Sequence, residues 1–154
     1  MKIKWIPIFM FFVPLIIGFI PSIFTRKNNE EWYPTLKKPV FNPQTVLFPI
    51  VWTILFLIMG VSGYRTWYIT DGRYHRAKLL FFVQLFFNFW WTVIFFGFKS
   101  PIIAMVDIIV LWITIILWIQ SLYILEKWIA FIQVPYLCWV TFASVLNGSI
   151  IYLN

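Results

Sequence analysis

Polar and aromatic side chains share helical faces inside segments that are otherwise apolar. Gln84, Asn88 and Trp91 are spaced four and three residues apart, which places them on one face of a helix. Trp52 and Phe56 form a second such set, four residues apart. Large indole faces beside a few amides suit a cavity with aromatic walls and polar anchors. The alternative is that these residues only join helices, since amides hydrogen-bond between neighbouring membrane helices.

A third stripe follows the last apolar segment, in which residues four apart are Pro135, Trp139, Ala143 and Asn147. Asp107 lies about one and a half helical turns into the apolar segment before it. An ionisable side chain at such a depth costs free energy and normally faces a bundle interior or a cavity. Two interpretations of Asp107 stay open: it fixes a contact between helices, or it lines a ligand cavity.

The elements that carry these residues must cross a membrane. Hydrophobic residues make up 62% of the chain and charged residues only 11%, whereas soluble domains carry about 25% charged residues. A helical span needs about 20 apolar residues, and the apolar run that ends at Phe24 is too long for a signal-peptide core, so we expect it to be retained. The sequence predicts an all-α integral membrane protein, one domain over 1–154, with five transmembrane helices at about 5–24, 43–69, 78–98, 102–125 and 128–153.

The longest polar stretch, 26–42, is predicted to be a loop. Its aromatic pair Trp32-Tyr33 indicates a loop that packs onto the bundle like a lid, because loops this long in compact domains are usually functional or disordered. Asn42 and Pro43 suit the N-cap and first position of the next helix. The other connections are short, which makes consecutive spans antiparallel neighbours.

Charge and rare residue types exclude several functions. The net charge is +7, but the basic residues are scattered among the loops, where contact with membrane lipid explains them better than nucleic acid does. The chain has one histidine, His75, outside the predicted spans, and one cysteine, Cys138. We therefore predict no metal site, no haem with an axial histidine and no resident cofactor.

The order and spacing of many of these residues resemble the TspO/MBR family, which comprises the tryptophan-rich sensory proteins of bacteria and the translocator protein (peripheral benzodiazepine receptor) of mitochondria. The resemblance extends from Trp32 to the last residue of the sequence. The residues that carry it are Trp32-Tyr33, Leu36, Lys38-Pro39, Pro43, Trp52, Met59-Gly60, Asn88, Trp91, Phe95-Phe96-Gly97, Asp107, Pro135-Tyr136-Leu137, Trp139, Phe142-Ala143 and Leu146-Asn147.

The resemblance implies a five-helix bundle, often a homodimer, with an internal pocket covered by the first loop. It implies binding of porphyrins such as protoporphyrin IX and of isoquinoline-like molecules, in a bacterial inner or plasma membrane. The loop cations Lys37 and Lys38 would meet the porphyrin carboxylates. The implied ligand-binding residues are Tyr33, Pro43, Trp52, Phe56, Asn88, Trp91, Asp107, Trp139, Ala143 and Asn147, with Phe56 standing where the family frequently has tyrosine.

Two classes of function are consistent with this resemblance. The first is porphyrin binding, with or without light-dependent oxidative degradation of the porphyrin, for which Trp52 and Trp139 are the candidate catalytic residues. The second is a transporter or stress regulator for tetrapyrroles or sterol-like lipids that performs no catalysis.

Overall fold

The computed structural model describes residues 5–69 and 74–154, and the regular elements in these ranges are all helical. Five helical segments there are long and apolar enough to cross a membrane, which confirms the predicted fold class. The helices are α1 (Trp5–Glu31), η1 (Tyr33–Thr35), α2 (Leu47–Tyr68), α3 (His75–Thr92), η3 (Val93–Gly97), α4 (Pro101–Leu125), α5 (Lys127–Phe131) and α6 (Val134–Leu153).

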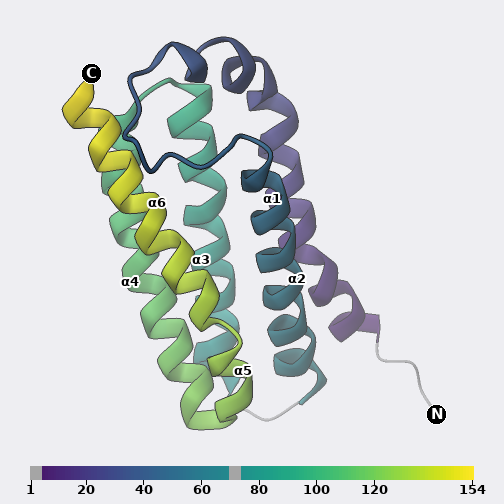
Figure 1. The fold of residues 1–154 in the computed structure, drawn as a ribbon. Helices are drawn as coiled ribbons and strands as arrows, with labels where there is room; N and C mark the ends of the chain where they lie inside the picture. Colours follow the sequence, from purple (N-terminus) through teal and green to yellow (C-terminus); the bar gives the residue numbers. More distant parts are fainter. Residues whose placement is uncertain (1–4, 70–73) are drawn as a thin grey trace.

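The spans form a bundle in which α1 packs against α2, α3 against α4, and α4 against α6 (Figure 1). Glycines let α1 and α2 approach closely. A Cβ atom at Gly60 would collide with the main-chain oxygen of Phe11, and one at Gly63 would lie 2.8 Å from the main-chain oxygen of Met10. Helix association in membranes depends on such close packing at small residues.

Helix α1 is longer than predicted, so the expectation of a loop that begins at residue 26 is wrong. The helix continues to Glu31. Arg26 Nε donates to Glu30 Oε1 at 2.8 Å, an i,i+4 pair that supports the helix beyond its apolar part. Asn28 Nδ2 donates to the carbonyl of Phe96 at 2.9 Å and so fixes this extension to η3. The irregular segment that remains, 32–46, is called the lid below.

Helix α2 begins at Leu47 rather than at residue 43. The predicted cap, Asn42, has another partner: its Oδ1 accepts a hydrogen bond of 3.0 Å from the Tyr33 hydroxyl. Tertiary contact therefore outweighs the local Asn-Pro signal for a helix start, and Pro43 lies half-buried in the lid.

The last span is not continuous, contrary to the predicted helix 128–153. It breaks between α5 and α6. Pro135 lacks a main-chain N–H and its ring clashes with the carbonyl four residues back, which belongs to Phe131, the last residue of α5. Gln133, wholly buried at the break, donates to Ser62 Oγ at 2.7 Å and to the Ile58 carbonyl at 3.0 Å.

At the end of the bundle opposite the lid, the Glu126 carboxylate accepts hydrogen bonds from several side chains. Arg65 binds Glu126 through two hydrogen bonds, Nε to Oε2 at 2.9 Å and Nη2 to Oε1 at 2.8 Å. The Tyr74 hydroxyl and the Trp128 indole N–H add one bond each, both of 3.0 Å. This cluster joins α2 and α5 to Glu126, which lies between α4 and α5.

Candidate functional site

Trp52 lies against aromatic rings of α2 and α6. Its indole stacks on the Phe56 ring, with 5.4 Å between ring centroids and 26° between planes. It meets the Tyr136 ring edge-on at 6.3 Å. Phe56 is buried, and Gly18 of α1 provides room for it, because a Cβ atom at Gly18 would collide with the Phe56 ring. The predicted pair therefore forms one aromatic wall.

A chain of buried hydrogen bonds lies behind this wall. Asn88 Nδ2 donates to the Tyr136 hydroxyl at 3.0 Å, and that hydroxyl donates to Gln84 Oε1 at 2.8 Å. Gln84 Nε2 in turn donates to the Phe81 carbonyl at 3.1 Å. One amide donor of Asn88, a predicted ligand-binding residue, is thus used to join α3 to α6.

Tyr136 is a site residue that the sequence analysis missed, although its side chain is wholly buried. The stripe chosen on the last span had residues four apart, and at about 100° per residue such a stripe drifts by about 40° at each step. The buried face follows alternating steps of four and three instead. It carries Tyr136, Val140, Ala143 and Asn147, while Pro135 is exposed and Trp139 half-buried. A search for apolar residues at alternating steps of four and three would have identified Tyr136 as part of the buried face.

A second aromatic group joins the lid to the loop end of α3. The Tyr33 ring lies 6.1 Å from Phe95 and 5.5 Å from Phe96. Trp91 stacks on Phe95 at 5.3 Å with 28° between planes. Phe95 and Phe96 belong to η3, a π-helical turn that replaces the predicted end of the third span. Such turns are frequent at functional sites, and this one brings the predicted residues Tyr33 and Trp91 onto a common ring.

A third aromatic group surrounds Trp139. Its indole lies 5.9 Å from the Phe48 ring of α2 and 5.4 Å from the Phe142 ring of α6. Phe41 of the lid contacts Phe142 at 6.2 Å. Trp139 therefore lies between the first turn of α2 and the face of α6 that meets the lid.

Buried polar atoms without a protein hydrogen-bond partner coincide with the predicted site. Four of them belong to predicted ligand-binding residues: Trp91 Nε1, Asp107 Oδ2, Trp139 Nε1 and Asn147 Oδ1. Two more in the described part of the chain, Trp118 Nε1 and Gln133 Oε1, belong to other residues. Buried polar groups nearly always have partners, so these indole donors and side-chain acceptors can bind polar atoms of a ligand.

These atoms extend from the loop end of the bundle toward its middle. At about 1.5 Å per residue, Asp107 lies about 9 Å along α4 from Pro101. Asn147 is close to the same end, because its Nδ2 donates to the Pro101 carbonyl at 2.8 Å. Across residues 5–69 and 74–154, no three His, Cys, Asp or Glu side chains gather as a metal site would need.

The lid lysines differ from each other. Lys38 Nζ donates to the carbonyls of Leu36 at 3.0 Å and Pro34 at 3.2 Å and lies 4.8 Å from the Tyr33 ring centroid. Partial burial lowers the pKa of Lys38. In this structure the Lys38 ammonium group stabilises the lid, and its contact with a ligand carboxylate stays a prediction. Lys37 is exposed.

Comparison with known proteins shows the family of the chain. The model of the TspO/MBR family matches residues 10–153. The "Tryptophan-rich protein TspO" of Chlorobaculum tepidum is 42% identical over 144 residues, 91% of this chain and 90% of the relative. The protein of the same name from Archaeoglobus fulgidus is 41% identical over 140 residues, 91% of each chain. The human "Translocator protein" is 30% identical over 151 residues, 93% of this chain and 87% of the relative. The chain is therefore a multi-pass membrane protein that belongs to the TspO/MBR family.

Proposed function

We propose that this protein binds a porphyrin, with protoporphyrin IX as the ligand, between the lid and helices α2, α3, α4 and α6. The observation that carries the proposal is the set of unpaired buried polar atoms on Trp91, Asp107, Trp139 and Asn147. Each buried polar group without a partner costs about 1–3 kcal/mol. Four of them in one part of the bundle are better explained as ligand contacts than as packing.

The chemistry of a porphyrin matches these groups. Its flat conjugated ring suits the aromatic faces of Trp52 and Trp139, for which stacked or edge-on contacts are favourable by about 0.5–1.5 kcal/mol beyond burial. Its carboxylates are acceptors for the indole N–H groups of Trp91 and Trp139. Its inner pyrrole N–H groups are donors for the oxygens of Asp107 and Asn147.

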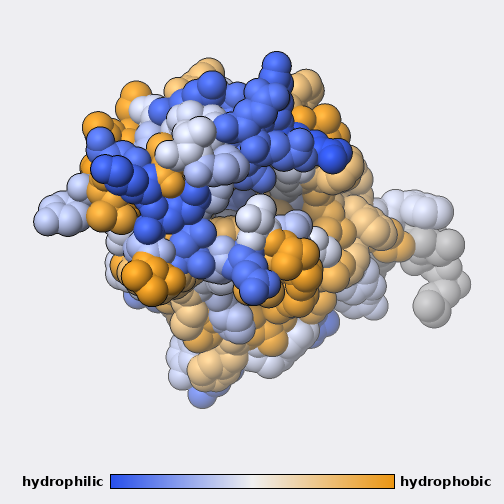
Figure 2. Space-filling model, turned by 45° about the horizontal axis from the view of Figure 1, so that its top comes forward, coloured by the Kyte–Doolittle hydropathy of each residue, from blue (hydrophilic) through white to orange (hydrophobic). Residues whose placement is uncertain are grey.

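Charge at the lid end favours the same ligand. Figure 2, in which this end comes forward, shows hydrophilic surface gathered there above the apolar sides of the bundle. Lys27, Lys37 and Lys99 contribute cations at this end. A porphyrin whose ring enters the bundle from this end has its carboxylates attracted by these cations, which reduces the cost of burying the carboxylates beside the indole N–H groups.

The test is a titration of detergent-solubilised protein with protoporphyrin IX in the dark, followed by tryptophan fluorescence. We expect saturable quenching at one ligand per chain. Linear, non-saturating quenching that a detergent blank reproduces would contradict the proposal.

Light-dependent degradation of the bound porphyrin stays a prediction, as do homodimer formation and location in the cell membrane. In the structure each of these two indoles packs on a neighbouring ring, Trp52 on Phe56 and Trp139 on Phe48. Illumination of the same complex tests the enzymatic alternative: a defined product that Trp52→Phe abolishes indicates catalysis, whereas mixed products at equal rates indicate bleaching.

A further inference from the structure

Within residues 5–69 and 74–154, the hydrogen-bonded link between the lid and the end of α6 uses the side chain of Asn154. The main-chain N–H of Lys37 donates to Asn154 Oδ1 at 2.9 Å, and Asn154 Nδ2 donates back to the Lys37 carbonyl at 2.9 Å. Asn154 Nδ2 also donates to the Ile150 carbonyl at 2.8 Å, which fixes the side chain on its own helix. The amide group thus pairs with the lid backbone as a neighbouring strand would.

The rest of segment 36–44 is held mainly by its own contacts. Within the described residues, its other hydrogen bonds join lid residues to one another, such as Tyr33 to Asn42 and Lys38 to Leu36, or join the end of the segment to the helix that follows it, where the Leu47 main-chain N–H donates to the Gln44 carbonyl at 2.9 Å. Its ring contact with a spanning helix is made by Phe41 on Phe142. Among the described residues, the pairing at Lys37 is therefore the hydrogen-bonded contact that joins this segment to a spanning helix far from it in the sequence.

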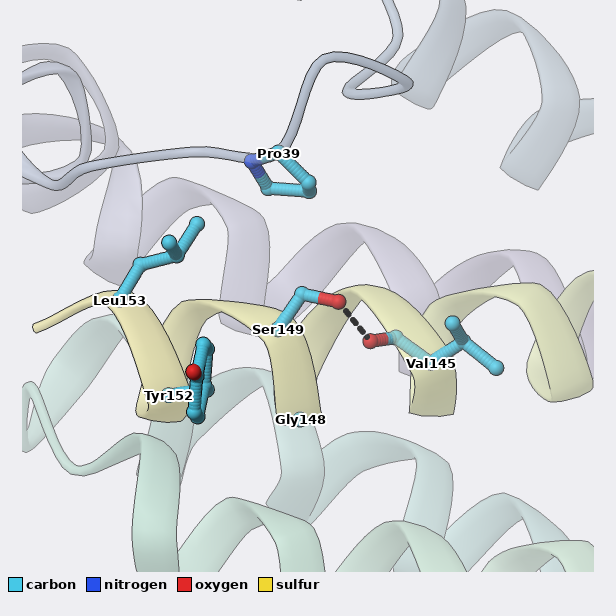
Figure 3. A pocket seen from close by; sticks show the side chains of 6 residues that line it. All are labelled: Pro39, Val145, Gly148, Ser149, Tyr152 and Leu153. Carbon is cyan, nitrogen blue, oxygen red and sulfur yellow. Dashed lines mark hydrogen bonds between the residues drawn. The ribbon is translucent and has the colours of Figure 1, made fainter.

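The lid stands off α6 directly beside that pairing. A groove of about 480 Å³ separates Pro39 from the outer face of α6 and is lined by Pro39, Val145, Gly148, Ser149, Tyr152 and Leu153 (Figure 3). Val40, the next lid residue, is fully exposed. Apart from the contact of Phe41 with Phe142, apolar packing thus contributes little to closure on this side, and release of the Asn154 amide would weaken the attachment of the lid to α6.

We propose that Asn154 is the latch of the lid and sets the rate at which ligand enters and leaves the bundle. This rests on the proposed function for the identity of the ligand, but the latch itself is a property of the chain. Asn154 is a positioning residue: it contacts the lid backbone and not the site residues. If free and occupied proteins close the same latch, weakening it accelerates entry and release equally and leaves the affinity unchanged.

The first measurement needs no ligand. Hydrogen–deuterium exchange of the lid peptide that contains the Lys37 amide is compared among wild type, Asn154→Ala and Asn154→Asp. Alanine removes both hydrogen bonds with Lys37, and we expect about tenfold faster exchange, which corresponds to about 1.4 kcal/mol. Aspartate keeps the acceptor but sets an oxygen against the Lys37 carbonyl, so its exchange is also faster. Ser149→Ala is the control, because the Ser149 hydroxyl bonds only to Val145 of its own helix.

The second measurement is stopped-flow quenching with protoporphyrin IX on the same proteins. We expect the association and dissociation rate constants of Asn154→Ala to rise together by about tenfold, with Kd within about twofold of wild type. Unchanged exchange of the lid peptide would overturn the proposal, as would faster dissociation alone with a weaker Kd. If wild type binds no porphyrin, the proposed function fails, and the exchange measurement still decides whether Asn154 holds the lid.

Discussion

Replacement of Trp139 by phenylalanine separates a ligand contact from a packing contact. The Trp139 indole packs on Phe48 and Phe142, and a phenyl ring keeps part of this contact. The indole N–H is buried and has no protein partner. The substitution therefore removes a donor that stabilises nothing in the ligand-free protein.

The expected magnitudes follow from this difference. In the ligand-free protein, loss of an unsatisfied donor is favourable and loss of buried ring surface is unfavourable, so the free energy of unfolding should change by less than about 1 kcal/mol. In the complex, the substitution removes the hydrogen bond from the Trp139 N–H to a porphyrin carboxylate, and a bond to a charged group contributes about 1.5–3 kcal/mol. We therefore expect Kd for protoporphyrin IX to rise by roughly 10- to 100-fold, while the midpoint of thermal unfolding shifts by only a few degrees.

The assay is fluorescence titration together with thermal unfolding in the same detergent. Trp112→Phe is the matched control: the Trp112 indole N–H donates to Thr141 Oγ1 at 2.8 Å on an exposed part of the bundle. We expect that control to leave Kd unchanged. Trp139→Phe with wild-type affinity would refute the reasoning, and so would an equal loss of affinity in Trp112→Phe.

Three further predictions concern other parts of the molecule. Asp107→Lys should abolish porphyrin binding or markedly lower the unfolding midpoint, because it places an unpaired cation where Asp107 is buried; wild-type affinity and stability together would show that Asp107 does not face the site. Gly18→Ala should weaken porphyrin binding, because the new Cβ atom pushes Phe56 against Trp52, and should lower the free energy of unfolding by about 1–3 kcal/mol. Gly148→Ala should be tolerated, because its Cβ atom would lie 3.8 Å from Met105. Equal unfolding midpoints and affinities in the two variants would contradict this. The hydrogen bonds from Arg65, Tyr74 and Trp128 hold the pKa of Glu126 below its ordinary value of 4.5. Their stabilisation is complete above that value and is lost as pH falls through the lowered pKa. Glu126→Gln should therefore remove the corresponding fall in unfolding midpoint below pH 4.5; a variant with the same acid dependence as wild type would show that this cluster does not contribute.

The fold could be predicted because the signals for membrane spans are long and local. The apolar segments that end near Phe24 and Leu125 need no tertiary information to be recognised. Helix boundaries were less predictable where a side chain had a distant partner. Asn42 binds Tyr33 instead of capping α2, and Asn28 fixes the extension of α1 to η3.

The residues of the candidate site could be predicted from the sequence, but the contacts that they make between helices could not. Trp52 and Phe56 are four residues apart on one helix, and their contact follows from that spacing. By contrast, the Asn88–Tyr136 bond joins residues on two helices, and spacing along one helix cannot show which of its amides meets another helix. The pairing of Asn154 with Lys37 likewise depends on the path of the lid, which no local pattern specifies.

The most direct test of the central claim observes the indole N–H groups themselves. Protein labelled with ¹⁵N at tryptophan is titrated with protoporphyrin IX in the dark, and the indole resonances are assigned by single Trp→Phe substitutions. We predict that the Trp91 and Trp139 indole resonances shift on binding, because their N–H groups gain acceptors. The Trp112 indole already donates to Thr141 and should keep its resonance position. Saturable binding that leaves the Trp91 and Trp139 resonances unmoved would contradict the account and place the porphyrin elsewhere.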